Sequence, residues 1–244
     1  STPLLSIFKR TGSEFVKLAD PADLPVTACK GGRFSPNGEF LFVDNFDVAG
    51  AGFIIYQKTR GTNNFTKLAD PAVNNGGTGI VSGVTWSPNS EFVAYSYNQT
   101  GRLWIYRRTG TTFDKVPDPG TMPISTSGKS HFSPADGRFL VCANSTVSPR
   151  ILIYSVTSTS TFTKLSDPSG VNNMVAVYDA KFSPNGKYLL CVGNAGMQMY
   201  ERSGTTFTII FSSSNSNFSG RACCFSPDGQ YIAIARNSNA VSIA

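Results

Sequence analysis

The stretch Phe34-Ser35-Pro36-Asn37-Gly38, followed by Glu39 and the apolar run at residues 40–43, decides the fold because the chain repeats it. Four further copies begin at Trp86, Phe132, Phe182 and Phe225, so the leading aromatics are 52, 46, 50 and 43 residues apart. Proline presets φ for a turn, and Asn or Asp followed by Gly supplies the positions with left-handed backbone. Each copy therefore predicts an aromatic anchor, a tight turn and the start of a strand.

The repeat contains four predicted strands, A to D. Strand A ends at the leading aromatic, and strand B is nearly continuous in its apolar character, as in residues 188–192. Strand C is represented by residues 103–106. Strand D is represented by residues 65–68, where alternation and a lysine indicate an outer edge. Four of the five D strands end in Asp-Pro, which stops a strand. A period near 50 residues suits one four-stranded blade of a β-propeller.

Five Ser-Pro turns and five D strands predict an all-β fold, a single β-propeller domain over residues 1–244 with five four-stranded blades. The chain opens with strands C and D and closes with strands A and B, so the N- and C-terminal strands should complete one blade together. Residues 239–244 resemble a further C strand, which leaves six blades as the alternative. The five leading aromatics should be buried between blades.

Composition restricts the function only loosely. The net charge of +6 comes from 21 basic and 15 acidic residues, which are scattered along the chain. This bias favours an acidic partner, and it is equally ordinary for a mildly basic soluble domain. No apolar run is long enough to span a bilayer, so membrane insertion is not expected. The five cysteines form no CxxC pair, which indicates free thiols and suits a reducing cytoplasm.

The repeat resembles the WD40-like propeller repeats of proteins encoded by tailed bacteriophages. The resemblance rests on the turn that begins at Phe225, the Ile-Tyr strands, the Phe-Thr-Lys-Leu strands and the Asp-Pro pairs. The Trp-Asp and Gly-His pairs of orthodox WD40 repeats are absent. The resemblance implies a virion component of the tail or the capsid surface, assembled in the host cytoplasm. Its implied partners are other virion proteins or a host-surface glycan, and a symmetric multimer within the assembly is one option.

The sequence offers little that predicts catalysis. It contains one histidine, His131, which precedes a leading aromatic and is interpreted as a packed or hydrogen-bonded structural residue. We find no motif for a metal site or a cofactor-binding loop, so neither a metal nor a cofactor is expected. Nucleic-acid binding is disfavoured because the basic hairpins lack interleaved aromatics. The chain is therefore expected not to be an enzyme.

Two surfaces are candidates for binding. The hairpins between strands C and D form a basic rim of Lys9, Arg10, Lys58, Arg60, Arg107, Arg108 and Arg202. These charges either keep the edge strands solvated or dock an acidic partner. The loops between strands D and A, such as residues 212–220, are polar and variable. Their candidate contacts are Asn74, Asn75, Asn172, Asn173, Asn215 and Asn217, although Asn also favours turns for local reasons.

These observations favour a non-catalytic bacteriophage virion protein, structural or for attachment, that presents one propeller face to a neighbour or to the host. The alternative is a stand-alone multivalent carbohydrate-binding lectin, in which repeated weak sites give avidity.

Overall fold

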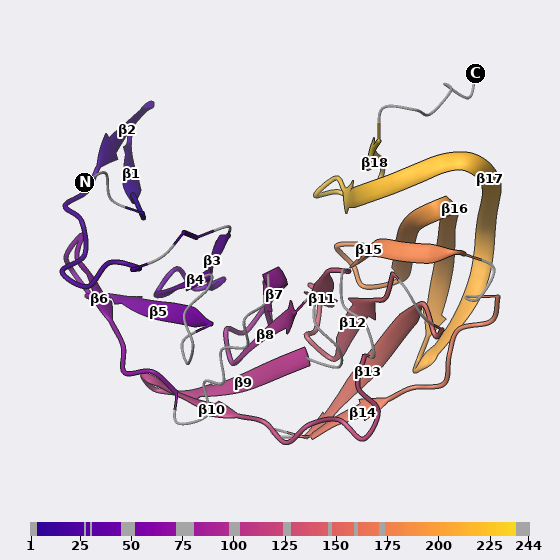
Figure 1. The fold of residues 1–244 in the computed structure, drawn as a ribbon, viewed down its shortest axis with the longest axis horizontal. Helices are drawn as coiled ribbons and strands as arrows, with labels where there is room; N and C mark the ends of the chain where they lie inside the picture. The colour runs from indigo at the N-terminus through magenta and orange to yellow at the C-terminus, as the bar shows by residue number, and fades with distance from the viewer. Residues whose placement is uncertain are drawn as a thin grey trace.

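The computed structural model describes residues 4–26, 28–29, 31–44, 52–71, 81–97, 103–123, 128–145, 148–158, 161–170 and 174–237. These residues form an all-β structure of antiparallel sheets that follow one another along an open arc (Figure 1). The architecture is that of a β-propeller, as the repeat predicts.

The strands group into a hairpin and successive blades. The hairpin is β1 (Phe8–Thr11) and β2 (Glu14–Lys17). Blade 1 is β3 (Gly32–Phe34), β4 (Phe40–Asp44), β5 (Phe53–Lys58) and β6 (Phe65–Lys67). Blade 2 is β7 (Val81–Trp86), β8 (Phe92–Tyr97), β9 (Leu103–Thr109) and β10 (Thr112–Lys115). Blade 3 is β11 (Ser130–Phe132), β12 (Phe139–Ala143), β13 (Ile151–Ser158) and β14 (Thr161–Lys164). The last sheet is β15 (Ala176–Phe182), β16 (Tyr188–Ser203), β17 (Thr206–Phe225) and β18 (Ile232–Arg236).

The last sheet contains more than one blade's strands. The amide of Arg202 donates to the carbonyl of Lys187, so the two ends of β16 lie side by side as strands B and C. The first part of β17 pairs with β16 as strand D, and Gly220–Phe225 pair with β18 as strands A and B of a further blade. Blade 4 is therefore β15, β16 and the first part of β17, and the second part of β17 with β18 is a half-blade.

The Ser-Pro turns share one hydrogen-bonded device. In blade 2, the Ser87 hydroxyl accepts the amide of Phe92 at 2.8 Å and donates to the Asn89 side-chain oxygen at 2.7 Å. The other four turns repeat both bonds. Four turns place a glycine at a positive φ, whereas blade 2 has Ser90 there at φ 58°. The serine side chain thus gives each turn two hydrogen bonds that the backbone alone could not form.

The core lies between blades. Phe42 and Phe53 of blade 1 pack with Tyr95 and Trp104 of blade 2 in one cluster, and equivalent clusters join blades 2 to 3 and 3 to 4. The leading aromatics Trp86, Phe132 and Phe182 are only 5–6% exposed. Both faces of each inner blade are thus covered, which accounts for the continuous apolar B strands.

The predicted closed ring of five blades is not observed. The hairpin β1–β2 and the strand β18 lie at opposite ends of the arc (Figure 1), and none of the described strand pairings joins them. The hairpin packs on blade 1 through Ile7, and the last half-blade packs on blade 4 through Cys223. Among the described residues only the hairpin β1–β2 comes before blade 1, and the expected burial of Phe34 is also wrong: it is 49% exposed. The segment behind the six-blade alternative, 239–244, lies outside the described residues.

The expected loop at residues 212–220 is a strand instead. Ser213 and Ser214 pair with Met197 and Gly196, and the Ser219 hydroxyl donates to the Asn194 side-chain oxygen at 3.1 Å. Pairing with the long strand β16 thus overrides the turn preference of this Ser- and Asn-rich sequence.

Candidate functional site

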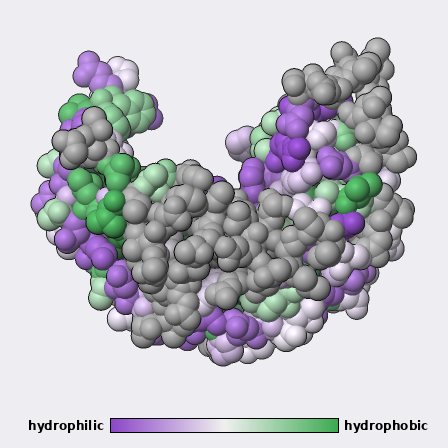
Figure 2. All heavy atoms as spheres, in the orientation of Figure 1, coloured by the Kyte–Doolittle hydropathy of each residue, from purple (hydrophilic) through white to green (hydrophobic). Residues whose placement is uncertain are grey.

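The innermost strands carry the polar cluster from which we build the site. The strands β3, β7, β11 and β15, with the second part of β17, follow the concave side of the arc (Figure 1). Figure 2 shows hydrophilic side chains along the concave edge of the arm that carries the C-terminal strands. Each of these strands starts a blade, so residues distant in sequence meet here.

His131 of β11 and Asp179 of β15 form a pair across two blades. The His131 Nε2 lies 3.0 Å from the Asp179 Oδ1. The Asp179 Oδ2 accepts the backbone amide of Cys223 at 3.1 Å, so the carboxylate also contacts the next inner strand. Asp179 is fully buried, whereas the His131 side chain remains 12% exposed. The carboxylate is thus fixed from two sides and holds the imidazole in one orientation.

The environment sets the charge of both groups. Burial lowers the pKa of His131; the hydrogen bond and charge of Asp179 oppose this effect, and Lys181 and Arg33 add to it. Burial acts to raise the pKa of Asp179, but the bonds from His131 and Cys223, with the charge of Lys129, outweigh it and hold the pKa below its ordinary value. Neutral imidazole beside an ionised carboxylate carries its proton on Nε2. The lone pair then lies on Nδ1.

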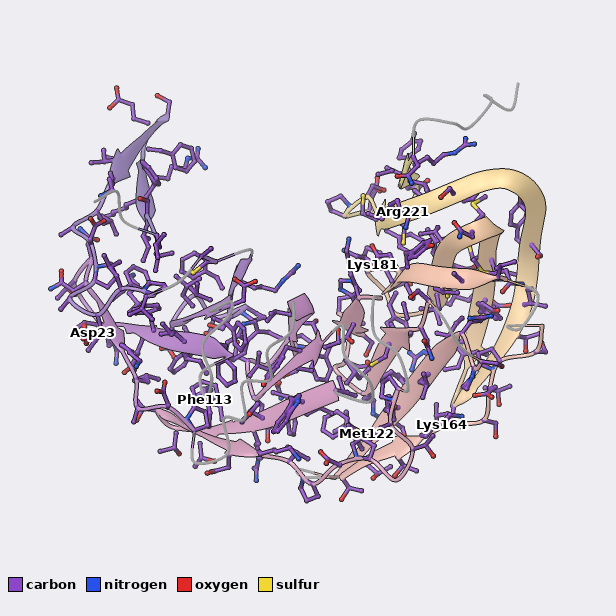
Figure 3. The ribbon with its side chains drawn as sticks, viewed as in Figure 1. Asp23, Phe113, Met122, Lys164, Lys181 and Arg221 are labelled. Atoms are coloured by element: carbon purple, nitrogen blue, oxygen red, sulfur yellow. The ribbon has the colours of Figure 1, made fainter. Side chains whose placement is uncertain are left out.

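Several cations surround this pair. The Lys129 Nζ lies 3.6 Å from the Asp179 Oδ2. Lys181 and Arg33 act electrostatically on His131. Arg221 stacks its guanidinium 4.1 Å from the centroid of the Tyr178 ring. Figure 3 shows Lys181 and Arg221 on the concave side of the arc. The site contains one buried carboxylate and several cations. Its net charge is therefore positive, which favours anionic ligands.

The cluster combines a neutral, oriented base with nearby positive charge. This combination can remove a proton from water and stabilise a developing oxyanion. Across the residues that the structure describes, no group of three or more His, Cys, Asp or Glu side chains could hold a metal ion. Within the same ranges, no helix is long and apolar enough to cross a membrane.

The sequence predicted part of this cluster. His131 is packed and hydrogen-bonded, as interpreted, but its partner Asp179 was not identified. A signal was present, because Asp179 is the one acidic residue within the described inner strands. The sequence alone does not show which strands are neighbours. It therefore could not predict a contact between two residues that lie 48 positions apart.

Two arginines of the basic rim link blades. The Arg108 guanidinium donates to the carbonyl of Ser90 at 2.9 Å and lies 5.0 Å from the centroid of the Phe40 ring in blade 1. Arg202 repeats this arrangement on the carbonyl of Gly186 and on the ring of Phe139. These two cations therefore serve blade packing.

The other rim residues also lie on or beside the hairpins between strands C and D. Arg107 forms a salt bridge with Glu91 at 3.0 Å, and Arg10 donates to the carbonyl of Gly12 at 2.8 Å. The remaining members, Lys9, Lys58 and Arg60, are exposed. Docking of a partner on this rim stays a prediction.

The amide residues predicted for the loop face remain without a structural description. Asn74, Asn75, Asn172 and Asn173 lie outside the described residues, and Asn215 and Asn217 fall within β17 without described side chains.

No known family model and no curated protein sequence matches the chain. Its fold matches solved structures. The periplasmic gluconolactonase of Pseudomonas aeruginosa is 15% identical over 96% of this chain and 70% of that protein, with a TM-score of 0.64. A candidate 6-phosphogluconolactonase of Bacteroides uniformis is 18% identical over 86% of this chain, with a TM-score of 0.62. The β-propeller domain of Cps50 (Swd1) from Myceliophteria thermophila is 11% identical, covers 86% of this chain and 62% of that one, and has a TM-score of 0.60.

These likenesses establish the propeller fold and provide no link to phages. The chain spans 64% of the length of the Bacteroides protein. The expected non-catalytic virion protein and its lectin alternative are contradicted, because similar propellers carry the names of lactonases. The expectation that the chain is not an enzyme is corrected by the same finding. Low sequence identity hid these similarities, and the sequence alone does not reveal that His131 pairs with a carboxylate.

Proposed function

We propose that the chain is a lactonase-type hydrolase that opens the ring of a sugar-acid lactone. The observation that carries this proposal is the pairing of His131 with buried Asp179 at 3.0 Å among cations on the concave side. The names of the similar gluconolactonase structures support the choice of substrate class.

The residues of the cluster suit each step of this reaction. The His131 Nδ1 takes a proton from water as the water oxygen attacks the lactone carbonyl carbon. The positive charge of Lys129 stabilises the oxyanion of the tetrahedral intermediate. When this intermediate collapses, the bond between the carbonyl carbon and the ring oxygen breaks, and the ring oxygen receives the proton from His131. The products are an open hydroxy acid and an unchanged enzyme.

The positive charge of the site favours a substrate that carries an anion. Arg33 and Lys181 act electrostatically on His131 and are the cations proposed to bind a phosphate or carboxylate at the far end of a sugar acid, since cations near the site raise the local concentration of anions. We therefore propose a phosphorylated sugar lactone as the preferred substrate.

The test is a proton-release assay with D-glucono-1,5-lactone and its 6-phosphate, corrected for spontaneous hydrolysis. The protein should accelerate both, with a higher kcat/KM for the phosphate ester. His131→Asn should lower kcat at least ~100-fold, the usual contribution of a general base. Lys181→Met should raise KM mainly for the phosphate ester, whereas Lys164→Met on the outer strand β14 serves as the matched control. Hydrolysis no faster than in buffer, or an unchanged rate for folded His131→Asn, would overturn the proposal.

A further inference from the structure

The connection between β12 and β13 in blade 3 carries three buried polar atoms that lack a partner. They are the Asn144 Oδ1, the Ser145 Oγ and the Arg150 Nη1, and none of them forms a hydrogen bond within the described part of the chain. Asn144 is fully buried, and Ser145 is only 9% exposed. Buried polar groups of folded proteins are almost always hydrogen-bonded, so this connection lacks partners that a protein normally supplies.

The backbone brings Asn144 and Arg150 together. The Asn144 amide donates to the Arg150 carbonyl at 2.8 Å, which extends the β12–β13 ladder one pair beyond Ala143 and Ile151. Residues directly opposite each other in an antiparallel ladder place their side chains on the same face, with Cβ atoms about 5 Å apart. The Asn144 Nδ2 donates to the carbonyl of Pro149 at 3.2 Å, so the amide is held with its Oδ1 as the remaining acceptor.

The repeat does not require polar side chains at these positions. In blade 4, Gly193 and Gly196 stand at the positions that Asn144 and Arg150 occupy in blade 3. The connection is also fixed from the next blade, because the Val177 amide donates to the Asn144 carbonyl at 3.2 Å. The polar atoms are therefore held in place by the fold, and the packing of the repeat does not account for them.

The charge of Arg150 determines the sign of a ligand for these atoms. Arg150 is partly buried, and within the described residues no acidic side chain forms a salt bridge with it. A guanidinium withdrawn from water without an anion is unfavourable, and a bound anion offsets this cost. The Ser145 hydroxyl can donate to the same anion, whereas the Asn144 Oδ1 only accepts. The three atoms together thus match an oxyanion that also carries a hydroxyl hydrogen.

We propose that Asn144, Ser145 and Arg150 bind a small oxyanion that bears a hydroxyl group, such as hydrogen phosphate. Two of its oxygens accept from the Arg150 Nη1 and the Ser145 Oγ, and its hydroxyl donates to the Asn144 Oδ1. A small hydroxy acid such as glycolate offers the same groups. Sulfate and acetate lack the hydroxyl hydrogen, so they leave the buried Asn144 oxygen unpaired. This inference does not depend on the proposed lactonase activity, because no residue of the concave cluster takes part.

Calorimetric titration tests the site with phosphate, sulfate, glycolate and acetate, in a buffer that contains no other oxyanion. In mildly alkaline solution phosphate and sulfate are both dianions of the same shape, so the hydroxyl is their main difference. Phosphate should bind at least about 10-fold more tightly than sulfate, because sulfate leaves a buried acceptor unpaired. A preference for glycolate over acetate, without one for phosphate over sulfate, would support the site and identify a hydroxy acid as its ligand. Equal affinities within both pairs, or no binding of any probe, would overturn the proposal.

Substitutions then assign the binding to these residues. Arg150→Met should lower the affinity for the preferred probe at least about 10-fold, because it removes the charged donor. Arg138→Met is the matched control, since Arg138 is an exposed arginine at the opposite end of β12, and its affinity should equal that of the wild type. Asn144→Asp keeps the size of the side chain and places a carboxylate beside Arg150, so it should remove anion binding. Unchanged affinity in folded Arg150→Met or Asn144→Asp would overturn the proposal.

Lys181→Met separates this site from the concave cluster, where a phosphate group of the substrate is proposed to bind. The variant should keep the affinity and the preference of the wild type for the preferred probe. Loss of binding in Lys181→Met, with Arg150→Met unaffected, would place the anion on the concave side and overturn the site in blade 3. The lactonase assay is a separate measurement, so failure of either proposal is recognised without reference to the other.

Discussion

The guanidinium of Arg108 lies 5.0 Å from the centroid of the Phe40 ring, and these two residues belong to different blades. The same guanidinium donates to the carbonyl of Ser90 at 2.9 Å, which is part of its own blade's turn. One side chain thus links the turn of blade 2 to the core of blade 1. The identical arrangement at Arg202 shows that this link belongs to the repeat.

Replacement of this arginine should destabilise the protein. Arg108→Met loses a charged hydrogen bond and a cation–π contact, so we expect the free energy of unfolding to fall by about 1–3 kcal/mol. Chemical denaturation measures this value. Arg107→Met is the control, because its partly exposed salt bridge with Glu91 should contribute less than ~1 kcal/mol. Equal effects of the two substitutions would contradict the role assigned to Arg108.

Replacement of Ser90 by either glycine or alanine should lower the free energy of unfolding. Its φ of 58° favours glycine, but its hydroxyl accepts the amide of Asn37 from blade 1 at 3.1 Å. Ser90→Ala keeps the backbone strain and loses the bond, so we expect a loss of about 1–2 kcal/mol. Ser90→Gly relieves strain while losing the same bond, so its effect should be smaller. Urea midpoints of both variants check this order, and a more stable alanine variant would refute it.

The leading aromatics should carry a large share of blade packing. Phe182 is 5% exposed and packs against Phe139 of blade 3 and Phe207 of its own blade. Phe182→Ala should therefore lower the free energy of unfolding by ~3–5 kcal/mol. Val26→Ala is the matched surface control, since Val26 is 75% exposed and the change should stay within ~0.5 kcal/mol. A small effect at Phe182 would mean that the blades separate more easily than their contacts suggest.

The sequence predicted the blades because each blade is specified locally. The Ser, the Asx and the glycine of one turn, as in Ser35, Asn37 and Gly38, lie within four residues and form their bonds with each other and with the next strand. The relative placement of blades is not local. The distance between β1 and β18 depends on the angle between every pair of blades, and no short motif encodes that angle.

The site was harder to predict for the same reason. His131 and Asp179 lie on different blades, and their pairing follows only from the neighbouring positions of β11 and β15. The structural roles of Arg108 and Arg202 were also not predicted. A cation in a hairpin is expected to be solvent-exposed, and the sequence does not show that each guanidinium lies over an aromatic ring of the preceding blade. Judged by charge alone, the basic rim therefore looks like the main binding surface, and the inner strands look less important for function than their contacts indicate.

Acidification should weaken the fold through His131. Its pKa is lowered from the ordinary value of 6.5, so the unfolded chain binds more protons than the folded one as the pH falls through this region. The contribution of His131 to stability is thus present above pH 6.5 and lost as the pH falls toward its folded pKa. The pKa of Asp179 is also lowered, so its contribution is lost only below the ordinary value of 3.8. The charged groups that face this pair are Lys129, Lys181 and Arg33, whose charges act on His131 or on Asp179.

Urea unfolding of the wild type and of His131→Asn separates this effect from all other titrations. Between about pH 7.5 and about pH 5, the wild type should lose more stability than the variant, because asparagine can still donate to Asp179 but does not titrate. The same lowered pKa should keep the proposed lactonase active into mildly acidic solution, since the neutral imidazole is the base. A stability difference between the two proteins that stays constant with pH would show that His131 has the same pKa in both states.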